Sequence, residues 1–348
     1  MHIDLNGEWQ LSYRPQTARW AVLEQVDFTQ MPTVPAEVPG NVELDLMRAG
    51  VLPDLAVGNN IYLYLLRELE CYEWWYRKQF TAPAVPEGYR AELVFDGLDC
   101  VANIWLNGVL IGEGTNALVP LRFDVTGILS EGENNLVVRI RSAVLEGRQH
   151  VPTPLESVQP CGFESLTIRK PPHCYGWDIM PRAVSAGIWR GVMLRFLPPT
   201  RWRSVYWATT AVHPARRSAV LFVDWDFTTN VHAIDDWQVR LRLSRNDATV
   251  HESLHPVFHT HGRARLHLQG VDLWYPRGYG EPVLYEASAD LLDGRGEVLD
   301  TYRCAIGIRT VERHRIDITT PEEPGEFVFV VNGVKIFAKG TNWVPLDA

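Results

Sequence analysis

Asp178 follows a short run of residues that could bind a sugar. Tyr175, Gly176 and Trp177 precede it directly, so its carboxylate could accept hydrogen bonds from two sugar hydroxyls beside an aromatic wall. A site that hydrogen-bonds hydroxyl groups rejects analogues that lack them, because its own polar groups are then left unpaired. The alternative interpretation is structural, since a loop aspartate can cap nearby backbone N–H groups.

Other acidic residues form pairs in the sequence that could be taken for catalytic carboxylates. Asp224 and Asp226 are two apart on an expected strand and would share one face, and Glu322 and Glu323 lie in a loop rich in proline and glycine. Both pairs are typical of solvated surface acids or turn caps. We therefore assign no catalytic residue to either pair.

Four histidines lie close together and raise the question of a metal site. They are His251, His255, His259 and His261. Zinc sites need three or four convergent ligands, and no cysteine or carboxylate motif accompanies these histidines, so a surface role is favoured and no metal is predicted. Glycine loops that cradle phosphates and a serine nucleophile elbow are absent from the sequence, so no cofactor is predicted either.

The overall composition is that of a soluble globular protein. Of the 348 residues, 46% are hydrophobic and 22% charged, and the formal net charge of −9 argues against a nucleic-acid partner. No apolar run of about 18 residues is present, so no membrane span is expected. The start, residues 1–7, has neither a basic region nor an apolar region of a signal peptide, which predicts a cytoplasmic location. The five cysteines are scattered, with no Cys-x-x-Cys pair, and are expected to be free buried thiols.

Most periodic stretches predict β-strands. Apolar residues alternate with arginines in Leu136–Arg141 and in Val239–Leu243, which predicts that the apolar side chains face a core and the arginines face solvent. Asn107-Gly108 and Asn332-Gly333 separate such stretches and predict two-residue hairpin turns. Trp74, Trp75, Trp105 and Trp189 are interpreted as core residues.

Only one short helix is predicted. Asn41 is its expected cap, Leu44 and Met47 are expected on one face, and Gly50 is its expected end. Many short strands with few helices indicate an all-β protein made of sandwiches.

Two breaks divide the chain into three predicted units. Pro198-Pro199 separates 1–198 from 199–318, and the acidic stretch Thr319–Gly325 begins 319–348. The last unit is too short to bury a core of its own.

The order of motifs along the chain resembles glycoside hydrolase family 2. The matching stretches are Leu5–Trp9, Val38–Asn41, Glu73–Lys78, Phe95–Asp99, Ala102–Gly108, Gly187–Arg190, Leu273–Pro276, Ile306–Glu312 and Lys339–Pro345. The resemblance implies a jelly-roll (galactose-binding-like) sandwich in 1–198, an immunoglobulin-like sandwich in 199–318, and the first hairpin and strand of a truncated TIM barrel in 319–348.

Within this family, the motif Tyr175–Asp178, with Arg169-Lys170 before it and Pro181 after it, resembles the β-mannosidases. That resemblance implies that Asp178, beside Trp177, hydrogen-bonds the sugar in the −1 subsite. It also implies that Asn342 and Trp343 lie at the catalytic end of the first barrel strand, although Trp343 could instead pack a domain junction. Arg169 and Lys170 are expected to be structural.

The sequence leaves the substrate open and assigns no catalytic residue. The family continues Trp-Gly-Pro after the aspartate, whereas this chain has Ile179-Met180-Pro181, which keeps β-galactoside, β-glucuronide and exo-β-glucosaminide specificity open. Retaining glycosidases need two carboxyl groups about 5–5.5 Å apart, and the resemblance places both on later barrel strands. A barrel takes roughly 250 residues, so the chain alone is predicted to be inactive.

The expected partners follow from this interpretation. They are a carbohydrate of the β-mannoside type and the missing catalytic barrel of the same polypeptide, without nucleic acid or membrane. Apolar surface uncovered in 319–348 predicts self-association. The alternative from another class is a stand-alone carbohydrate-binding protein without catalysis.

Overall fold

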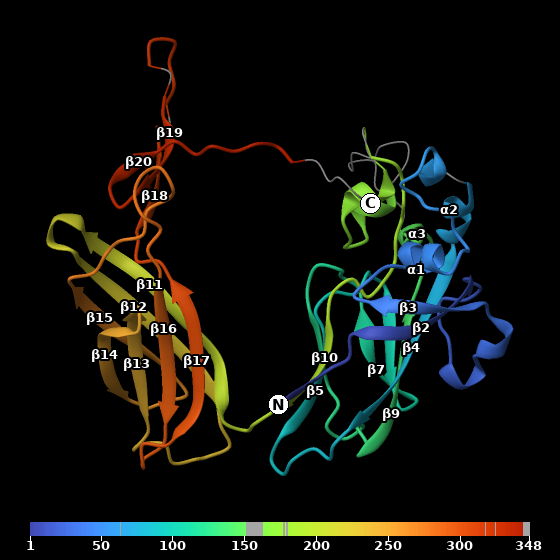
Figure 1. The fold of residues 1–348 in the computed structure, drawn as a ribbon, viewed down its shortest axis with the longest axis horizontal. Helices are drawn as coiled ribbons and strands as arrows, with labels where there is room; N and C mark the ends of the chain where they lie inside the picture. Colours follow the sequence, from blue (N-terminus) through green and yellow to red (C-terminus); the bar gives the residue numbers. More distant parts are fainter. Residues whose placement is uncertain are drawn as a thin grey trace. The chain divides into compact units, whose positions relative to one another are not determined.

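The computed structural model describes residues 1–62, 64–150, 163–176, 178, 180–316, 318–323 and 325–343. The chain divides into two compact units, one built on Met1–Leu197 and the other on Pro198–Asn342 (Figure 1). Both consist mainly of antiparallel strands, which confirms the predicted all-β class. Within the described ranges, no helix is both long enough and apolar enough to cross a bilayer.

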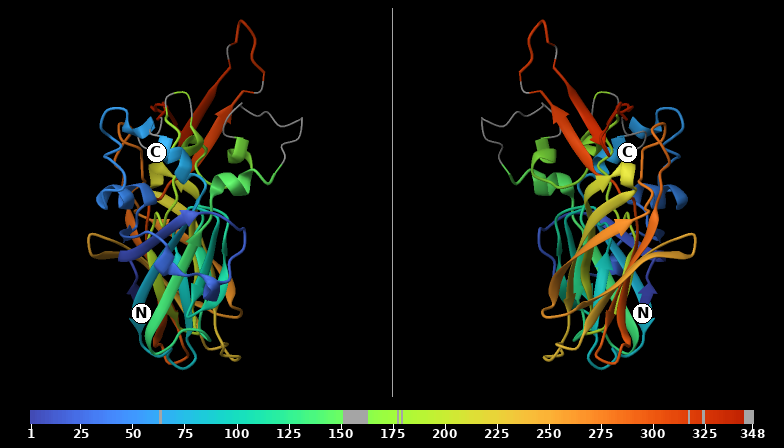
Figure 2. Two further views of the ribbon diagram at one scale, coloured as in Figure 1. Left: turned by 90° about the vertical axis from the view of Figure 1, so that its right-hand side faces the viewer. Right: turned by 90° about the vertical axis from the view of Figure 1, so that its left-hand side faces the viewer.

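The first unit is a sandwich of two sheets, with strand orders β3-β2-β4-β9-β6-β7 and β1-β10-β5-β8. The larger sheet contains β2 (Gly7–Pro15), β3 (Thr33–Val38), β4 (Tyr72–Ala82), β6 (Ala102–Leu106), β7 (Val109–Gly114) and β9 (Gly132–Ile140). The smaller contains β1 (His2–Asp4), β5 (Arg90–Phe95), β8 (Leu121–Asp124) and β10 (Val192–Leu197). The helices α1 (Val42–Arg48), α2 (Tyr64–Leu69) and α3 (Ala143–Gly147) gather at one end of the strands (Figure 2).

Alternation along the strands builds the core of this sandwich. Trp9 and Leu11 of β2 and Val138 and Ile140 of β9 are at most 2% exposed and belong to one apolar cluster between the sheets. Fully burying one large apolar side chain stabilises the fold by about 1.5–3 kcal/mol. The period-2 pattern therefore identified the inward face of the larger sheet correctly.

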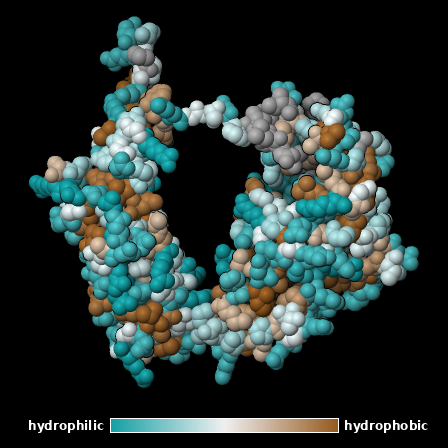
Figure 3. Space-filling model, in the orientation of Figure 1, coloured by the Kyte–Doolittle hydropathy of each residue, from teal (hydrophilic) through white to brown (hydrophobic). Residues whose placement is uncertain are grey.

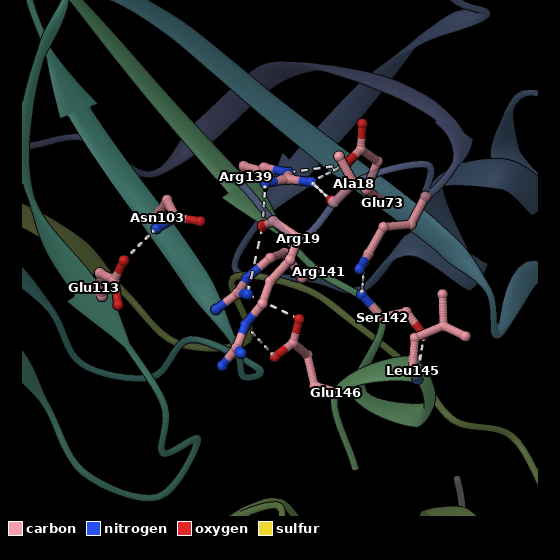
Figure 4. Close-up of polar contacts among 11 residues, drawn as sticks. Ala18, Arg19, Glu73, Asn103, Glu113, Arg139, Arg141, Ser142, Leu145 and Glu146 are labelled. Carbon is pink, nitrogen blue, oxygen red and sulfur yellow. Dashed lines mark hydrogen bonds and ion pairs between the residues drawn. The ribbon is translucent and has the colours of Figure 1, made fainter. Parts of the chain in front are cut away.

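The opposite face of the larger sheet, called here the outer face, is partly covered by segment 16–31. Trp75 and Trp105 stack on this face with ring centroids 5.7 Å apart, and the ring of Phe28 meets Trp75 edge-on. Arg139 is 1% exposed and donates to Glu73 and to the carbonyls of Ala18 and Arg19, at 2.6 and 2.9 Å for the two carbonyls (Figure 4).

Neighbouring polar contacts continue this arrangement along the outer face. Arg141 donates to Glu146 at 2.8 Å, and Asn103 donates to Glu113 at 2.8 Å (Figure 4). The Gln16 side chain accepts from the backbone N–H of Ser142 at 2.7 Å. Segment 16–31 is thus held by charged and polar contacts as well as by aromatic packing.

The second unit is a sandwich of sheets β11-β12-β15 and β14-β13-β16-β17, followed by the small sheet β18-β19-β20. The sandwich strands are β11 (Arg201–His213), β12 (Ser218–Thr228), β13 (Gln238–Arg245), β14 (Ala248–Pro256), β15 (His261–Gln269), β16 (Tyr285–Leu292) and β17 (Val298–Ile306). The small sheet contains β18 (Val311–Arg315), β19 (Phe327–Val331) and β20 (Val334–Ile336). Figure 3 shows hydrophobic residues scattered among hydrophilic ones on the visible side of both units.

Local predictions of turns and of the helix start are confirmed. Asn107 and Asn332 have φ values of 51° and 50°, each followed by a glycine with positive φ, as two-residue hairpins require. The Asn41 side chain accepts from the N–H of Leu44 at 2.9 Å and caps α1.

Other local predictions are wrong. Arg139 and Arg141, predicted to face solvent, are 1% and 4% exposed, because each pairs with a buried carboxylate, Glu73 and Glu146 respectively. Trp189 is 37% exposed rather than core, whereas Trp74, Trp75 and Trp105 are buried. The short helices α2 and α3 were not predicted.

The cysteines in the described part of the chain are free. Cys100 and Cys174 are buried, while Cys71 and Cys304 are only half-buried. Cys161 lies outside the described residues.

We expect Glu73→Gln to destabilise the first unit by about 3–5 kcal/mol, because it leaves buried Arg139 without its counter-charge. Urea denaturation measures the effect. Glu133→Gln is the matched control at an exposed position of β9, and we expect it to change the free energy of unfolding by no more than about 0.5 kcal/mol. Equal effects of the two substitutions would contradict a role for the buried pair.

Asp45 predicts a specific pH dependence. It is fully buried and accepts from the N–H of Glu37 and from Arg48, and burial raises its pKa to about 6. A raised pKa means that the folded protein binds this proton more tightly than the unfolded chain, so stability falls as pH rises from about 4 through about 6. We expect Asp45→Asn to reduce this loss in the free energy of unfolding by up to about 3 kcal/mol. Urea denaturation of the unsubstituted protein and of Asp45→Asn between these pH values measures the effect. The prediction is contradicted if the free energy of unfolding changes with pH in the same way in both proteins.

Candidate functional site

Residues 163–190, called here the Asp178 loop, carry the predicted sugar-binding aspartate. The loop contains two 3-10 turns, Phe163–Leu166 and Pro172–Tyr175, and Asp178 is exposed. Gly176 precedes it with φ of 93°, and an added Cβ would lie 3.2 Å from Cβ of Arg182. The conformation and the space therefore both favour glycine at this turn. Trp177, the predicted neighbour of Asp178, lies outside the described residues.

A buried arginine–carboxylate pair holds the loop on the sandwich. Arg182 donates to both carboxylate oxygens of Glu70, at 2.8 and 2.7 Å, and each side chain is 8% exposed. Burial lowers the pKa of Arg182, but the hydrogen bonds and charge of Glu70 outweigh it, so the net pKa is raised. Arg182 also donates to the carbonyl of Tyr175 at 3.3 Å. This pair fixes the backbone on both sides of Asp178.

A second buried pair anchors the loop further along. Lys170, whose side chain is fully buried, donates to Asp99 at 2.7 Å and to the carbonyl of Ser185 at 2.9 Å. The Ser185 hydroxyl donates to Glu43 of α1 at 2.6 Å. Burial lowers the pKa of Lys170, but attraction to Asp99 outweighs it, and the pKa is raised. Lys170 therefore stays charged and has the structural role expected for it.

The end of the loop packs closely against the start of α1. Gly187 pairs through its backbone with Asp99, and the N–H of Val42 donates to the carbonyl of Ala186 at 2.9 Å. An added Cβ at Gly187 would lie 2.5 Å from the carbonyl oxygen of Gly40. The backbone at Gly187 can lie this close to the backbone at Gly40 because Gly187 has no side chain.

Tyr175 forms the buried side of the turn before Asp178. It is 2% exposed, the guanidinium of Arg182 lies 5.5 Å from its ring centre, and its hydroxyl has no hydrogen-bond partner among the described residues. Burial raises the pKa of this hydroxyl. Tyr175 is therefore a neutral packing residue beneath the loop, and not an exposed wall for a sugar ring.

The other predicted residues have exposed side chains. Asn342 and Trp343 are both exposed, Trp343 to 76%, and their sharing of one site with Asp178 stays a prediction. Arg169 contributes its carbonyl, which accepts from the N–H of Ala117 at 2.8 Å, while its side chain is exposed.

Acidic residues and histidines of the second unit have local partners. Asp224 pairs with Arg263 at 2.5 Å and Asp226 with Arg203 at 3.6 Å. His259 and His261 stack with ring centres 5.8 Å apart. Across the described ranges, no group of three or more histidine, cysteine or acidic residues could hold a metal ion.

Sequence reasoning did not find Glu70, Asp99 and Arg182, which place the loop. Lys170 and Asp99 are 71 residues apart in the chain, and Arg182 and Glu70 are 112 apart. No local motif marks Glu70 or Arg182, and the motif that contains Asp99 did not indicate its partner. The run Arg169-Lys170 was noticed only through its resemblance.

Comparisons with known proteins agree with this architecture. Residues 9–190 match the model described as the glycosyl hydrolase 2 galactose-binding domain-like family, and residues 204–309 match the model of glycosyl hydrolases family 2. The chain belongs to glycoside hydrolase family 2. The predicted family is thereby confirmed.

Individual relatives in family 2 are named β-mannosidases. The chain is 34% identical to beta-mannosidase B of Thermothelomyces thermophilus over 90% of its length, and 33% identical to that of Aspergillus terreus over 94%. These matches span only 36% and 38% of the two relatives.

Solved structures show the same fold. The beta-D-mannosidase of Dictyoglomus thermophilum matches with a TM-score of 0.78 and 32% identity, over 99% of this chain and 40% of that one. A beta-glucuronidase of Bifidobacterium dentium matches with a TM-score of 0.64 and 22% identity, over 96% of this chain and 50% of that one, which is a likeness of fold alone.

We expect Arg182→Gln to destabilise the first unit by about 1.5–3 kcal/mol, since it removes the two charged hydrogen bonds of Arg182 and leaves buried Glu70 with the contact to exposed Arg67 at 3.2 Å. The loop should also become more accessible, so backbone amides around Gly176 should exchange hydrogen faster. Urea denaturation and hydrogen exchange measure the two effects. Arg122→Gln, at an exposed position of β8, is the matched control, and unchanged exchange in Arg182→Gln would contradict anchoring by this pair.

Proposed function

We propose that this chain is the non-catalytic N-terminal region of a retaining exo-β-glycosidase, most specifically a β-mannosidase. The relatives named beta-mannosidase B and the β-D-mannosidase structure support this substrate class. The catalytic glutamates would come from the rest of the polypeptide, because the matches span little more than a third of the relatives' length.

The observation that carries the proposal is the way Asp178 is presented. It is exposed on a loop whose flanks are fixed by the Arg182–Glu70 and Lys170–Asp99 pairs. Preorganised acceptors gain affinity because little conformational freedom is lost on binding. In this role Asp178 accepts hydrogen bonds from hydroxyl groups of the sugar in the −1 subsite, and the buried pairs position it.

The chain by itself is proposed not to hydrolyse glycosides. The acidic pair Asp224 and Asp226 is bound by arginines in the second unit. A retaining mechanism needs two carboxyl groups about 5–5.5 Å apart, one acting as nucleophile and the other as acid and base. Aryl β-glycosides, including the mannoside, galactoside and glucuronide, test this directly, and turnover of any of them by the 348-residue chain would refute it.

The mannoside assignment is tested in the polypeptide read through its natural frame beyond residue 348. We expect this longer protein to cleave the β-mannoside, and Asp178→Ala to lower kcat/KM for it by about a hundredfold or more, because two hydrogen bonds to a charged acceptor are lost. Glu131→Ala, at an exposed acidic position of the first unit, is the control and should leave kcat/KM unchanged.

Two other outcomes would decide against the proposal. If the longer protein preferentially cleaves the galactoside, glucuronide or glucosaminide, the family assignment stands and the β-mannoside assignment is rejected. A stop codon directly after Ala348, together with sugar binding and no hydrolysis, would favour a stand-alone carbohydrate-binding protein.

A further inference from the structure

The outer face of the six-stranded sheet contains a hollow of about 400 Å³. It is called here the outer-sheet hollow. The outward side chains that line it come from three adjacent strands and are Glu8, Gln10, Arg77, Gln79, Asn135 and Val137. This volume is within the range of small-molecule sites, about 300–1,000 Å³.

Strand register arranges these residues in two rows across β2, β4 and β9. Gln10 is paired with Arg77 and Arg77 with Val137, while Gln79 is paired with Asn135. Direct cross-strand neighbours have Cβ atoms about 4.5–5.5 Å apart, and the two rows are separated by about 7 Å along the strands. The hollow therefore has a compact floor on regular strands, which hold side chains more rigidly than loops do.

Arg77 is fixed in place before any ligand arrives. Its guanidinium lies 4.3 Å from the ring centre of Phe28 and donates to the Ser12 hydroxyl at 3.2 Å. No carboxylate pairs with it among the described residues, and its Nε is buried there without a hydrogen-bond partner. Most of its five donors therefore have no partner in the described structure.

The neighbouring cation is already used by the protein. Lys78 donates to the carbonyls of Asn6 and Glu8 at 3.1 and 3.0 Å, and its ammonium lies 5.6 Å from the ring centre of Trp9. Glu8 has no ion pair within the described ranges, and the charge of its carboxylate acts on the ammonium of Lys78, where it opposes the lowering of the Lys78 pKa by burial.

The chemistry of the lining points to a neutral ligand with many hydroxyl groups. The amides of Gln10, Gln79 and Asn135 are exposed, and each offers both donors and acceptors, as a hydroxyl does. Val137 supplies an apolar contact at the floor. A phosphate or a uronate would meet the carboxylate of Glu8, which disfavours an anion.

We propose that the outer-sheet hollow binds a neutral oligosaccharide, as a second glycan site separate from the Asp178 loop. Glu70, which anchors that loop, precedes β4, whereas Gln79 lies near the far end of that strand. The six residue steps from Glu73 to Gln79 span about 20 Å at the rise of a strand. This site does not depend on the assignment of Asp178 to the −1 subsite.

The test is a titration of the isotope-labelled 348-residue chain with β-1,4-mannohexaose and, separately, with cellohexaose, followed by NMR. We expect at least one of the two to shift the amide signals of Gln79 and Asn135 in a saturable way. The double substitution Gln79→Ala and Asn135→Ala should weaken binding by about tenfold or more. Both side chains are exposed, and an unchanged thermal midpoint confirms that the variant is folded.

Two controls separate this site from the loop. Gln269→Ala, at an exposed position of β15 in the second unit, should leave the affinity unchanged, and in Asp178→Ala the amide signals of Gln79 and Asn135 should still shift in a saturable way. The proposal is overturned if neither oligosaccharide shifts the hollow, if the double substitution has no effect, or if a tetragalacturonate binds there in preference to both. Binding that is lost only in Asp178→Ala would also overturn it, while leaving the proposed function intact.

Discussion

Buried pairs between a cationic side chain and a carboxylate hold the irregular segments of the first unit on its sandwich. Arg139 and Glu73 fix segment 16–31, and Arg182 and Glu70 fix the Asp178 loop. An ion taken out of water costs several kcal/mol, so a buried pair is tolerated only in a geometry that satisfies its hydrogen bonds. That requirement leaves the attached backbone few alternative positions.

The sandwich core and the loop satisfy different physical needs. Between the sheets, alternating apolar side chains such as Trp9 and Val138 exclude water and supply most of the stability. The described residues of the Asp178 loop form only short 3-10 turns, which cannot build such a core by themselves. Its order comes from charged contacts and close backbone approach at Gly187, which suits a segment that must leave Asp178 exposed.

Membership of family 2 and the geometry of the first unit address different questions. The family match covers both sandwiches and relates the chain to enzymes named β-mannosidases. The structure adds which residues hold the loop and where a second polar surface lies. In both places a rigid scaffold carries groups suited to hydroxyls, a carboxylate on the loop and amides on the sheet, which is how sites are commonly built on sandwich folds.

The sequence by itself determined features that depend on neighbouring residues. Period-2 strands, the positive-φ turns at Asn107 and Asn332 and the Asn41 cap follow from local sterics and hydrogen bonding, and all were predicted. The short helices α2 and α3 were missed, because helices of five or six residues are stabilised mainly by packing. Only the tertiary structure determines which charged residues pair. Arg182 and Glu70 are 112 residues apart, and the sequence does not distinguish Glu70 from the other acidic residues as the partner of Arg182. Only the folded sheets bring these two together and exclude the water that would otherwise screen them.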